Sequence, residues 1–467
     1  MAISPARTAA FHALASVAAG RADLPSALAY ARTRLDDERD RGLTAAIVTG
    51  TLRWQRLLDH LIEHVSRRPL SKLDASVLVI ARLSLYQILH LDRVPAAAVV
   101  DDAVNLTRAA KKPSAAGFVN AVLRSTLRQR HRLPIPARPK DLGNREDTLA
   151  YLGITLSHPD WLVARWLDRY GFEHAERWAQ FNNEPAPLTL RANRLRTSRQ
   201  AVQQTLGTED IDTEPTQYAP DGLIVTTGNP LRRPLDGTFL VQDESSQLVP
   251  LALNAQPGER VLDLCASPGG KTVAIASIMN DSGVLVASDV RARRVSLMRD
   301  TIRASGATHV HLVHIASAGH LPFDAVFDRV LVDAPCSGLG TIRRDPDIKW
   351  RRQERDLEAL ASAQLDLLTR AATVVRPGGR LVYATCSSEL EENDDVVRAF
   401  LTRHPDWRQL DLRTDGTASL TPVIDDTGVL RTLPFVHGLE AFYATALVRG
   451  SGPGQAGVRS GTGRGRV

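Results

Sequence analysis

The stretch from Val330 to Trp350, VLVDAPCSGLGTIRRDPDIKW, decides the fold predicted for this chain. It begins with a short apolar run, which is typical of a buried parallel strand. The run ends at Asp333, and Cys336 follows three residues later, so a carboxylate and a thiol come after the strand. In open α/β sheets, ligands bind at the carboxyl ends of the strands. We therefore expect both side chains to lie in a binding site.

A charged loop follows this strand. It carries the basic residues Arg343, Arg344 and Lys349 and the indole of Trp350. Basic side chains suit phosphates, and aromatic side chains suit stacked bases. We therefore expect these four residues to contact nucleic acid.

The surrounding sequence, from about residue 246 to 450, alternates between strand and helix patterns. This alternation predicts a doubly wound, Rossmann-like α/β domain. Strands are expected at 260–265, 283–288, 309–315, 330–332 and 380–385, helices at 291–305 and 354–375, and a final hairpin at 429–434 and 441–448.

The rest of the chain predicts a multidomain protein. Residues 1–132 follow helical spacing and predict an all-α bundle, in which the mostly apolar stretch 74–89 forms the central helix. A Pro- and charge-rich linker is expected at 133–155, a small α+β subdomain at 156–245 and a disordered basic tail at 451–467. The indoles of Trp161, Trp166 and Trp178 are expected to be core residues of the small subdomain.

Composition limits the class of protein. A chain of 467 residues with 43% hydrophobic and 24% charged residues has ample material for several cores. No apolar run approaches the ~18 residues of a membrane helix, and the Ala-rich N-terminus continues into helical patterning rather than a signal peptide. Three widely spaced cysteines predict neither disulfides nor a zinc site. We expect a cytoplasmic, monomeric protein without a metal.

The charge is unevenly distributed along the chain. The formal net charge is +6, but residues 1–135 hold 20 Lys/Arg and 11 Asp/Glu, a net +9, and the tail from Ser451 adds three Arg. Attraction to nucleic acid would therefore be concentrated in the N-terminal segment and the tail. On charge alone, an ordinary solvated basic surface is an equal alternative.

A glycine-containing turn follows the first strand of the α/β domain. It matches neither GxGxxG nor a Walker motif, but adjacent glycines let a ligand approach the backbone and the start of a helix. Asp289 follows the next strand, where a carboxylate can accept hydrogen bonds from a ribose. These features predict an adenosine-containing cofactor, whose identity they leave open; a structural turn with a surface Asp is the alternative. The turn residues are Cys265, Ala266, Ser267, Pro268, Gly269, Gly270 and Lys271.

Two thiols are expected at the same edge of the sheet. Cys336 and Cys386 both follow predicted strands, so they should converge on one crevice with Asp333. Cytosine C5 is a poor nucleophile, but addition of a thiolate to C6 makes C5 reactive towards a methyl sulfonium. A nucleophilic thiol, a second thiol or base, and an acid near N3 suit this chemistry. Inert buried cysteines are the alternative.

Two resemblances agree with this interpretation. The segments 83–89, 92–95, 103–104 and 117–124 resemble the NusB family of RNA-binding helical domains, and 261–272, 329–350 and 380–388 resemble RNA 5-methylcytosine methyltransferases that use S-adenosylmethionine. Together they point to the RsmB-type group of this family, which methylates a cytosine in small-subunit (16S) ribosomal RNA.

The resemblance implies a role for each site residue. Cys386 would attack C6, Cys336 would assist release of the methylated base, and Asp333 would hold the cytosine edge and border the cofactor. The backbone of residues 265–271 would cradle the methionine part of S-adenosylmethionine, and Asp289 would bind its ribose. Residues 343–350 would flank the RNA.

The chain also departs from the family pattern. The acidic residue expected after the third strand is replaced at or near Ala316, where Ser317 could substitute, and His437–Phe442 lacks the usual Asp-Gly-Phe. The missing acid motivates an alternative, an RNA-binding scaffold with a degenerate methyltransferase domain. A methyltransferase acting on transfer RNA or protein is another.

Overall fold

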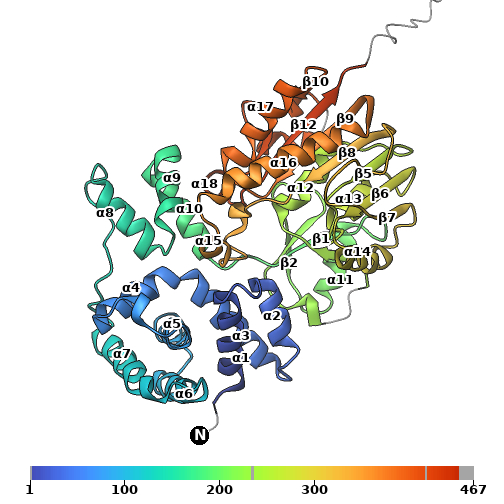
Figure 1. Ribbon diagram of the computed structural model, residues 1–467. Helices are drawn as coiled ribbons and strands as arrows, with labels where there is room; N and C mark the ends of the chain where they lie inside the picture. The colour runs from blue at the N-terminus through green and yellow to red at the C-terminus, as the bar shows by residue number, and fades with distance from the viewer. Residues whose placement is uncertain (1–2, 233–235, 416–417, 452–467) are drawn as a thin grey trace, which may run out of the picture. The chain divides into compact units, whose positions relative to one another are not determined.

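The computed structural model describes residues 3–232, 236–415 and 418–451. The chain forms two compact units, Met1–Ala186 with Thr341–Glu354, and Pro187–Gly340 with Arg355–Val467 (Figure 1). The division at Ala186 separates the first two helices of the expected α+β subdomain, before residue 184, from its strands. The tail predicted from Ser451 onward lies, after its first residue, outside the described residues.

The first unit begins with a helical bundle, as predicted. Figure 1 shows α5 surrounded by the other helices of the bundle. Asp74 starts α5 because its side chain accepts hydrogen bonds from the amides of Ser76 and Val77. Val79, Ile80 and Leu83 are among the buried residues of α5, which confirms its central position. The bundle helices are α1 (Pro5–Ala18), α2 (Leu24–Arg32), α3 (Glu38–Arg53), α4 (Gln55–Ser66), α5 (Ala75–His90), α6 (Ala96–Ala109) and α7 (Ala116–Gln129).

Three further helices follow the bundle in this unit. The expected linker is less irregular than its composition indicates, because it contains α8 (Arg145–Ala150) and a π-helical turn (Tyr151–Thr155). The helices α9 (Asp160–Tyr170) and α10 (Phe172–Asn183) follow. They pack through Trp166 and Trp178, whose stacked rings lie 4.9 Å apart and are buried. This pair confirms the predicted core role of these two indoles.

The second unit opens with a small antiparallel sheet of strand order β2-β3-β1-β4. The helix α11 (Arg199–Gly207) packs on it through Val202 and Leu206. The strand β2 and the helix α11 were not expected, because neither carries a strong apolar pattern. The strands are β1 (Thr189–Ala192), β2 (Thr213–Pro215), β3 (Gly222–Val225) and β4 (Phe239–Val241).

The large sheet of the second unit has the order β10-β12-β9-β8-β5-β6-β7, with β11 paired to β12. The five adjacent strands from β9 to β7 are parallel, and β12 pairs antiparallel with both β9 and β10. The predicted strands are confirmed, whereas β10 was not expected. The strands are β5 (Arg260–Asp263), β6 (Val284–Asp289), β7 (Val310–His314), β8 (Phe327–Asp333), β9 (Val375–Thr385), β10 (Trp407–Leu410), β11 (Leu430–Arg431) and β12 (Tyr443–Arg449).

Helices cover both faces of this sheet because its strands are apolar on both sides. Val330 and Val332 pack on one face with residues of α16 and α17, whereas Leu331 packs on the other with residues of α12 and α13. The helices are α12 (Glu244–Leu253), α13 (Gly270–Ile278), α14 (Ala292–Ser305), α15 (Ile348–Arg351, in the first unit), α16 (Asp356–Thr373), α17 (Asp394–Arg403) and α18 (Pro434–His437). Among the described residues, no helix combines the length and apolar character that crossing a membrane requires.

Candidate active site

The site lies where the strand order of the large sheet reverses. From β5 the chain proceeds through β6 to β7 on one side, and then through β8 to β9 on the other. Such a reversal opens a crevice beyond the carboxyl ends of the two central strands, here β5 and β8. The glycine turn follows β5, and Asp333 ends β8. The predicted site residues therefore emerge from adjacent strands.

The turn after β5 is held close to the sheet by its backbone. Ala266 donates its amide to the Ser288 carbonyl at 2.9 Å, and the Gly269 amide donates to the Ala266 carbonyl at 2.7 Å. Gly269 has φ +101°, a conformation that a side chain disfavours, and α13 begins at the next residue. The first amides of α13 thus face the crevice edge, where a helix N-terminus favours anionic groups.

Asp289 ends β6 beside this turn. Its side chain is only 5% exposed. One oxygen accepts a hydrogen bond from the amide of Arg291 at 2.9 Å, and the other lies 3.8 Å from the guanidinium of Arg294. These contacts hold the carboxylate at the strand end, where it suits ribose hydroxyls.

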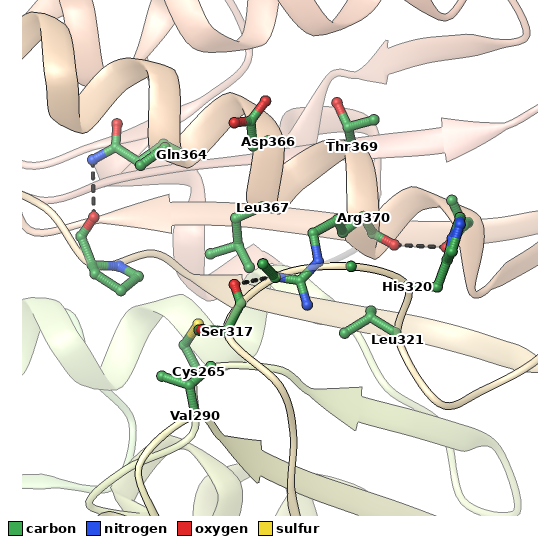
Figure 2. Close-up of a pocket in the computed structure, with 15 residues that line it drawn as sticks. Cys265, Val290, Ser317, His320, Leu321, Gln364, Asp366, Leu367, Thr369 and Arg370 are labelled. Atoms are coloured by element: carbon green, nitrogen blue, oxygen red, sulfur yellow. Dashed lines mark hydrogen bonds between the residues drawn. The ribbon is translucent and has the colours of Figure 1, made fainter.

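A cavity of about 670 Å³ continues from the turn (Figure 2). Cys265, Val290 and Pro335 contribute to its mainly apolar lining, which suits an adenine ring. Burial raises the pKa of the Cys265 thiol, so this cysteine stays neutral. The turn, the strand-end carboxylate and the cavity together fit an adenosine-containing cofactor. The remaining lining residues are Ser317, Ala318, Gly319, His320, Leu321, Ala363, Gln364, Asp366, Leu367, Thr369, Arg370 and Thr373.

The loop that lacks the expected acidic residue is bound by an arginine from a neighbouring helix. Figure 2 shows the guanidinium of Arg370, on α16, directed at the loop after β7. It donates to the Ser317 carbonyl at 2.9 Å and to the Ala316 carbonyl at 3.0 Å. Ser317 lines the cavity, and its role as a substitute for the acid stays a prediction. The loop shape is therefore maintained without a carboxylate.

The two predicted thiols meet in the crevice. The sulfur atoms of Cys336 and Cys386 lie 3.3 Å apart, and both side chains are partly exposed. Contact with the Cys386 thiol, followed by burial, raises the pKa of the Cys336 thiol well above its ordinary value. Cys336 is thereby disfavoured as a thiolate.

Asp333 is paired with a residue that was expected only as part of the cofactor turn. The Lys271 ammonium donates to Asp333 Oδ2 at 2.7 Å. Burial on its own would lower the pKa of Lys271, but the Asp333 carboxylate outweighs it, and the pKa of Lys271 is raised. The Asp333 side chain remains 27% exposed, so it is still open to a ligand.

The loop predicted to face nucleic acid is largely buried in the first unit. The Lys349 ammonium donates to the carbonyls of Arg53 at 2.9 Å and Ser157 at 2.6 Å, and its side chain is fully buried. The Trp350 indole donates to the Leu52 carbonyl. The expected RNA contact of Lys349 is therefore wrong, because its side chain is fully buried, whereas Trp350 is only partly buried and its contact with RNA stays a prediction.

The two arginines of the loop are partly buried, unlike the fully buried Lys349. Arg343 lies over the ring of Phe181 at 4.3 Å and pairs with Glu184 at 3.3 Å, while Arg344 is partly buried. Their contact with RNA stays a prediction.

One buried acid near the thiols was not foreseen. Glu392 is fully buried and accepts hydrogen bonds from Ser337 and Ser387, the residues that follow the two cysteines. The sequence offers only a weak signal for it, an acidic pair six residues beyond Cys386.

Comparisons with known proteins agree with this geometry. Family models match residues 250–448 as 16S rRNA methyltransferase RsmB/F, 4–128 as the NusB family and 158–232 as the ferredoxin-like domain of RsmF/B-like methyltransferases. The match at 158–232 includes α9 and α10. By compactness, these two helices belong to the same unit as the helical bundle.

Relatives align over most of the chain. This chain is 35% identical to the probable ribosomal RNA small subunit methyltransferase B of Bacillus subtilis, in an alignment that covers 88% of this chain and 91% of the relative. It is 37% identical to the ribosomal RNA small subunit methyltransferase B of Pseudomonas putida, covering 88% and 92%. A crystal structure of PH0851 has the same fold, with a TM-score of 0.78, 24% identity and coverage of 96% and 99%. The chain therefore belongs to the RsmB/F family of methyltransferases, and its cofactor is S-adenosylmethionine.

Proposed function

We propose that the protein methylates C5 of a cytosine in small-subunit (16S) ribosomal RNA through a covalent bond between Cys386 and C6 of the base. The observation that carries the proposal is the 3.3 Å separation of the Cys336 and Cys386 sulfur atoms at the ends of adjacent strands. Methyl transfer to an oxygen or nitrogen atom needs no such pair, whereas methylation of C5 needs a thiol to add and a group to assist its release.

The chain's own residues would hold the cofactor on one side of the thiols. The backbone of residues 265–271 would cradle its methionine part, Asp289 its ribose, and the cavity beside Val290 and Ser317 its adenine. The bound cofactor supplies a methyl group on a sulfonium, which C5 of the base can attack once C6 carries the thiol.

Each side chain of the site has its own role in the reaction. The Cys386 thiolate forms the Sγ–C6 bond, and C5 becomes nucleophilic. Asp333, fixed by Lys271, accepts from the exocyclic amino group and so holds the cytosine edge. After transfer, a water molecule would accept the C5 proton, and the electron pair of the C5–H bond would re-form the C5–C6 double bond and expel Cys386 as a thiolate. The neutral Cys336 thiol, 3.3 Å from that sulfur, would assist release by donating a hydrogen bond to the departing thiolate. Arg343 and Arg344 remain proposed RNA contacts.

The choice of ribosomal RNA rests on the relatives. Those of Bacillus subtilis and Pseudomonas putida are named for the small ribosomal subunit, and the first unit matches the NusB family. The net charge of +9 on residues 1–135 also suits a nucleic-acid surface. We further propose the domain bounds predicted above and a cytoplasmic location.

The test is analysis of the methylated product. Wild-type protein is incubated with tritiated S-adenosylmethionine and either unmodified small-subunit rRNA or unmodified transfer RNA, and the digested nucleosides are separated. We expect label in 5-methylcytidine from rRNA and none with the Cys386→Ala variant. Label in another nucleoside, or preferential labelling of transfer RNA, would contradict the proposal. RNA binding without cofactor binding or transfer would support the scaffold alternative.

A further inference from the structure

The loops that carry the two thiols share a single buried carboxylate. Glu392 Oε2 accepts from the hydroxyls of both Ser337 and Ser387, each of which directly follows one of the cysteines. Glu392 Oε1 accepts from the Ser337 amide at 2.7 Å and from the Gln364 side chain at 2.9 Å. One side chain therefore binds the two loops together.

The backbone and neighbours of Glu392 strengthen this connection. Tyr383, near the end of β9, donates its hydroxyl to the Glu392 carbonyl at 2.5 Å. The adjacent Asn393 donates to the Ser387 carbonyl at 2.9 Å, and Gln364 donates to the Pro335 carbonyl at 3.0 Å. Glu392, in the short 3-10 helix Leu390–Glu392 after β9, is thus bound through its backbone to the sheet and through its carboxylate to α16, which are rigid elements.

We infer that Glu392 is a positioning residue that sets the separation and orientation of the Cys336 and Cys386 thiols. The inference rests on the proposed function, because it assigns Glu392 to the same reaction. Four hydrogen bonds to one buried carboxylate fix the residues next to both sulfurs, and nucleophile placement is sensitive to shifts of about 1 Å.

The negative charge of Glu392 also affects the protonation of the Cys336 thiol. It contributes to the raised pKa of Cys336, after the larger effects of contact with Cys386 and of burial. A carboxylate at this place therefore favours the neutral form of Cys336.

The first readout measures the thiols without RNA or cofactor. Phenylarsine oxide bridges two thiols, with loss of water, only when their sulfur atoms are close, and the bridged Cys336–Cys386 peptide pair is measured by mass spectrometry. The second readout is the single-turnover methylation rate with saturating RNA. Variants are Glu392→Gln, which keeps the shape but removes the charge and one acceptor, and Asp395→Asn as the matched control. Asp395 lies three residues further along the chain, in α17, and its carboxylate pairs with Arg398.

We expect Glu392→Gln to fold, to bind S-adenosylmethionine as wild type does, and to lose bridging and at least about tenfold in single-turnover rate, without a change in KM for RNA. Asp395→Asn should match wild type in both readouts. Wild-type bridging and rate in Glu392→Gln would overturn the inference.

Two further variants apply if Glu392→Gln does not fold. Ser337→Ala and Ser387→Ala each remove one hydroxyl from the carboxylate, and we expect each to reduce bridging and rate; wild-type values in both would overturn the inference. The readouts also separate the two proposals. Altered bridging with no 5-methylcytidine made by wild type would reject the proposed function alone, whereas normal methylation with unaltered bridging and rate would reject the role of Glu392 alone.

Discussion

The carboxyl group of Asp263 lies beneath the cofactor turn, at the end of β5. It is fully buried, and Thr272 donates to it at 2.7 Å. Burial, with a smaller effect of the Asp333 charge, raises the pKa of Asp263 from 3.8 to about 7. Since the folded state holds this proton more tightly than the unfolded state, the contribution of Asp263 to stability is complete below pH 4 and is lost as the pH rises through about 7.

The Asp263→Asn variant should therefore change the pH dependence of stability. Asparagine mimics the neutral acid, so the free energy of unfolding of the variant relative to wild type should rise between pH 5 and pH 8, by about 2–3 kcal/mol at most. Denaturant unfolding at both pH values, followed by tryptophan fluorescence, measures this difference. If the difference in free energy of unfolding between variant and wild type were the same at pH 5 and pH 8, Asp263 would ionise with an ordinary pKa.

At the scale of elements, Gly340 joins the two loops of the site. Its amide donates to the Cys386 carbonyl at 3.0 Å, and its carbonyl accepts from the Ala441 amide at 3.0 Å. A Cβ atom here would lie 1.9 Å from the Ala441 carbonyl oxygen and 2.8 Å from that of Cys386. Both neighbours are backbone atoms, so an added methyl group must displace the loop that carries Cys386.

We expect Gly340→Ala to lower the free energy of unfolding by about 1–3 kcal/mol and to reduce the methylation rate at least tenfold. Gly42→Ala is the control, because Gly42 lies within α3 with no atom within 4 Å of the added Cβ; it should be neutral or stabilising. Thermal unfolding and single-turnover kinetics report the two effects. Equal stability and equal methylation rates of Gly340→Ala and Gly42→Ala would contradict a close packing requirement at Gly340.

The segment that contains Lys349 illustrates a limit of sequence-based prediction. The strand ends, the glycine turn and both thiols were predictable because apolar runs and turn residues are local signals. Lys349 instead bonds a carbonyl 296 positions away, and Glu392 bonds a serine 55 positions away. Such distant partners leave no local pattern, so a buried lysine was interpreted as an RNA contact and a central acid was overlooked.

Substitution of Lys349 tests the corrected role. We expect Lys349→Ala to cost about 2–4 kcal/mol of unfolding free energy, because it removes a buried alkyl chain and the donor to two carbonyls. Lys72→Ala, at an exposed position, should stay within about 0.5 kcal/mol of wild type. RNA affinity of the folded Lys349→Ala protein should be unchanged. A stable variant with weakened RNA binding would restore the contact first predicted.

At the scale of the whole molecule, basic charge is concentrated in the first unit. Arg124 and Arg128 are exposed on α7 and exemplify this surface. Binding to phosphates releases counterions, so affinity for RNA should fall as salt increases. Apart from the tail, the rest of the chain carries a net negative charge. Removal of arginines from the first unit should therefore weaken RNA binding more than removal of arginines elsewhere.

The double variant Arg124→Ala, Arg128→Ala should bind rRNA more weakly and show a shallower dependence of log affinity on log salt, by about 1–2 units. The control Arg398→Ala, Arg403→Ala removes two exposed arginines of α17 in the second unit and should change neither value. Filter binding between 50 and 200 mM salt, a range in which phosphate contacts are strongly affected, measures both. Equal losses in the two double variants would contradict a specific role of the first unit.

The central claim, that Cys386 attacks the base and Cys336 assists release, is tested most directly by trapping the adduct. Cys336→Ala protein is incubated with tritiated S-adenosylmethionine and unmodified small-subunit rRNA, and then denatured. We predict a labelled protein–RNA adduct that survives denaturation and is absent from the double variant Cys336→Ala, Cys386→Ala. Methyl transfer to cytosine without an adduct in the single variant, or an adduct that persists in the double variant, would contradict these roles.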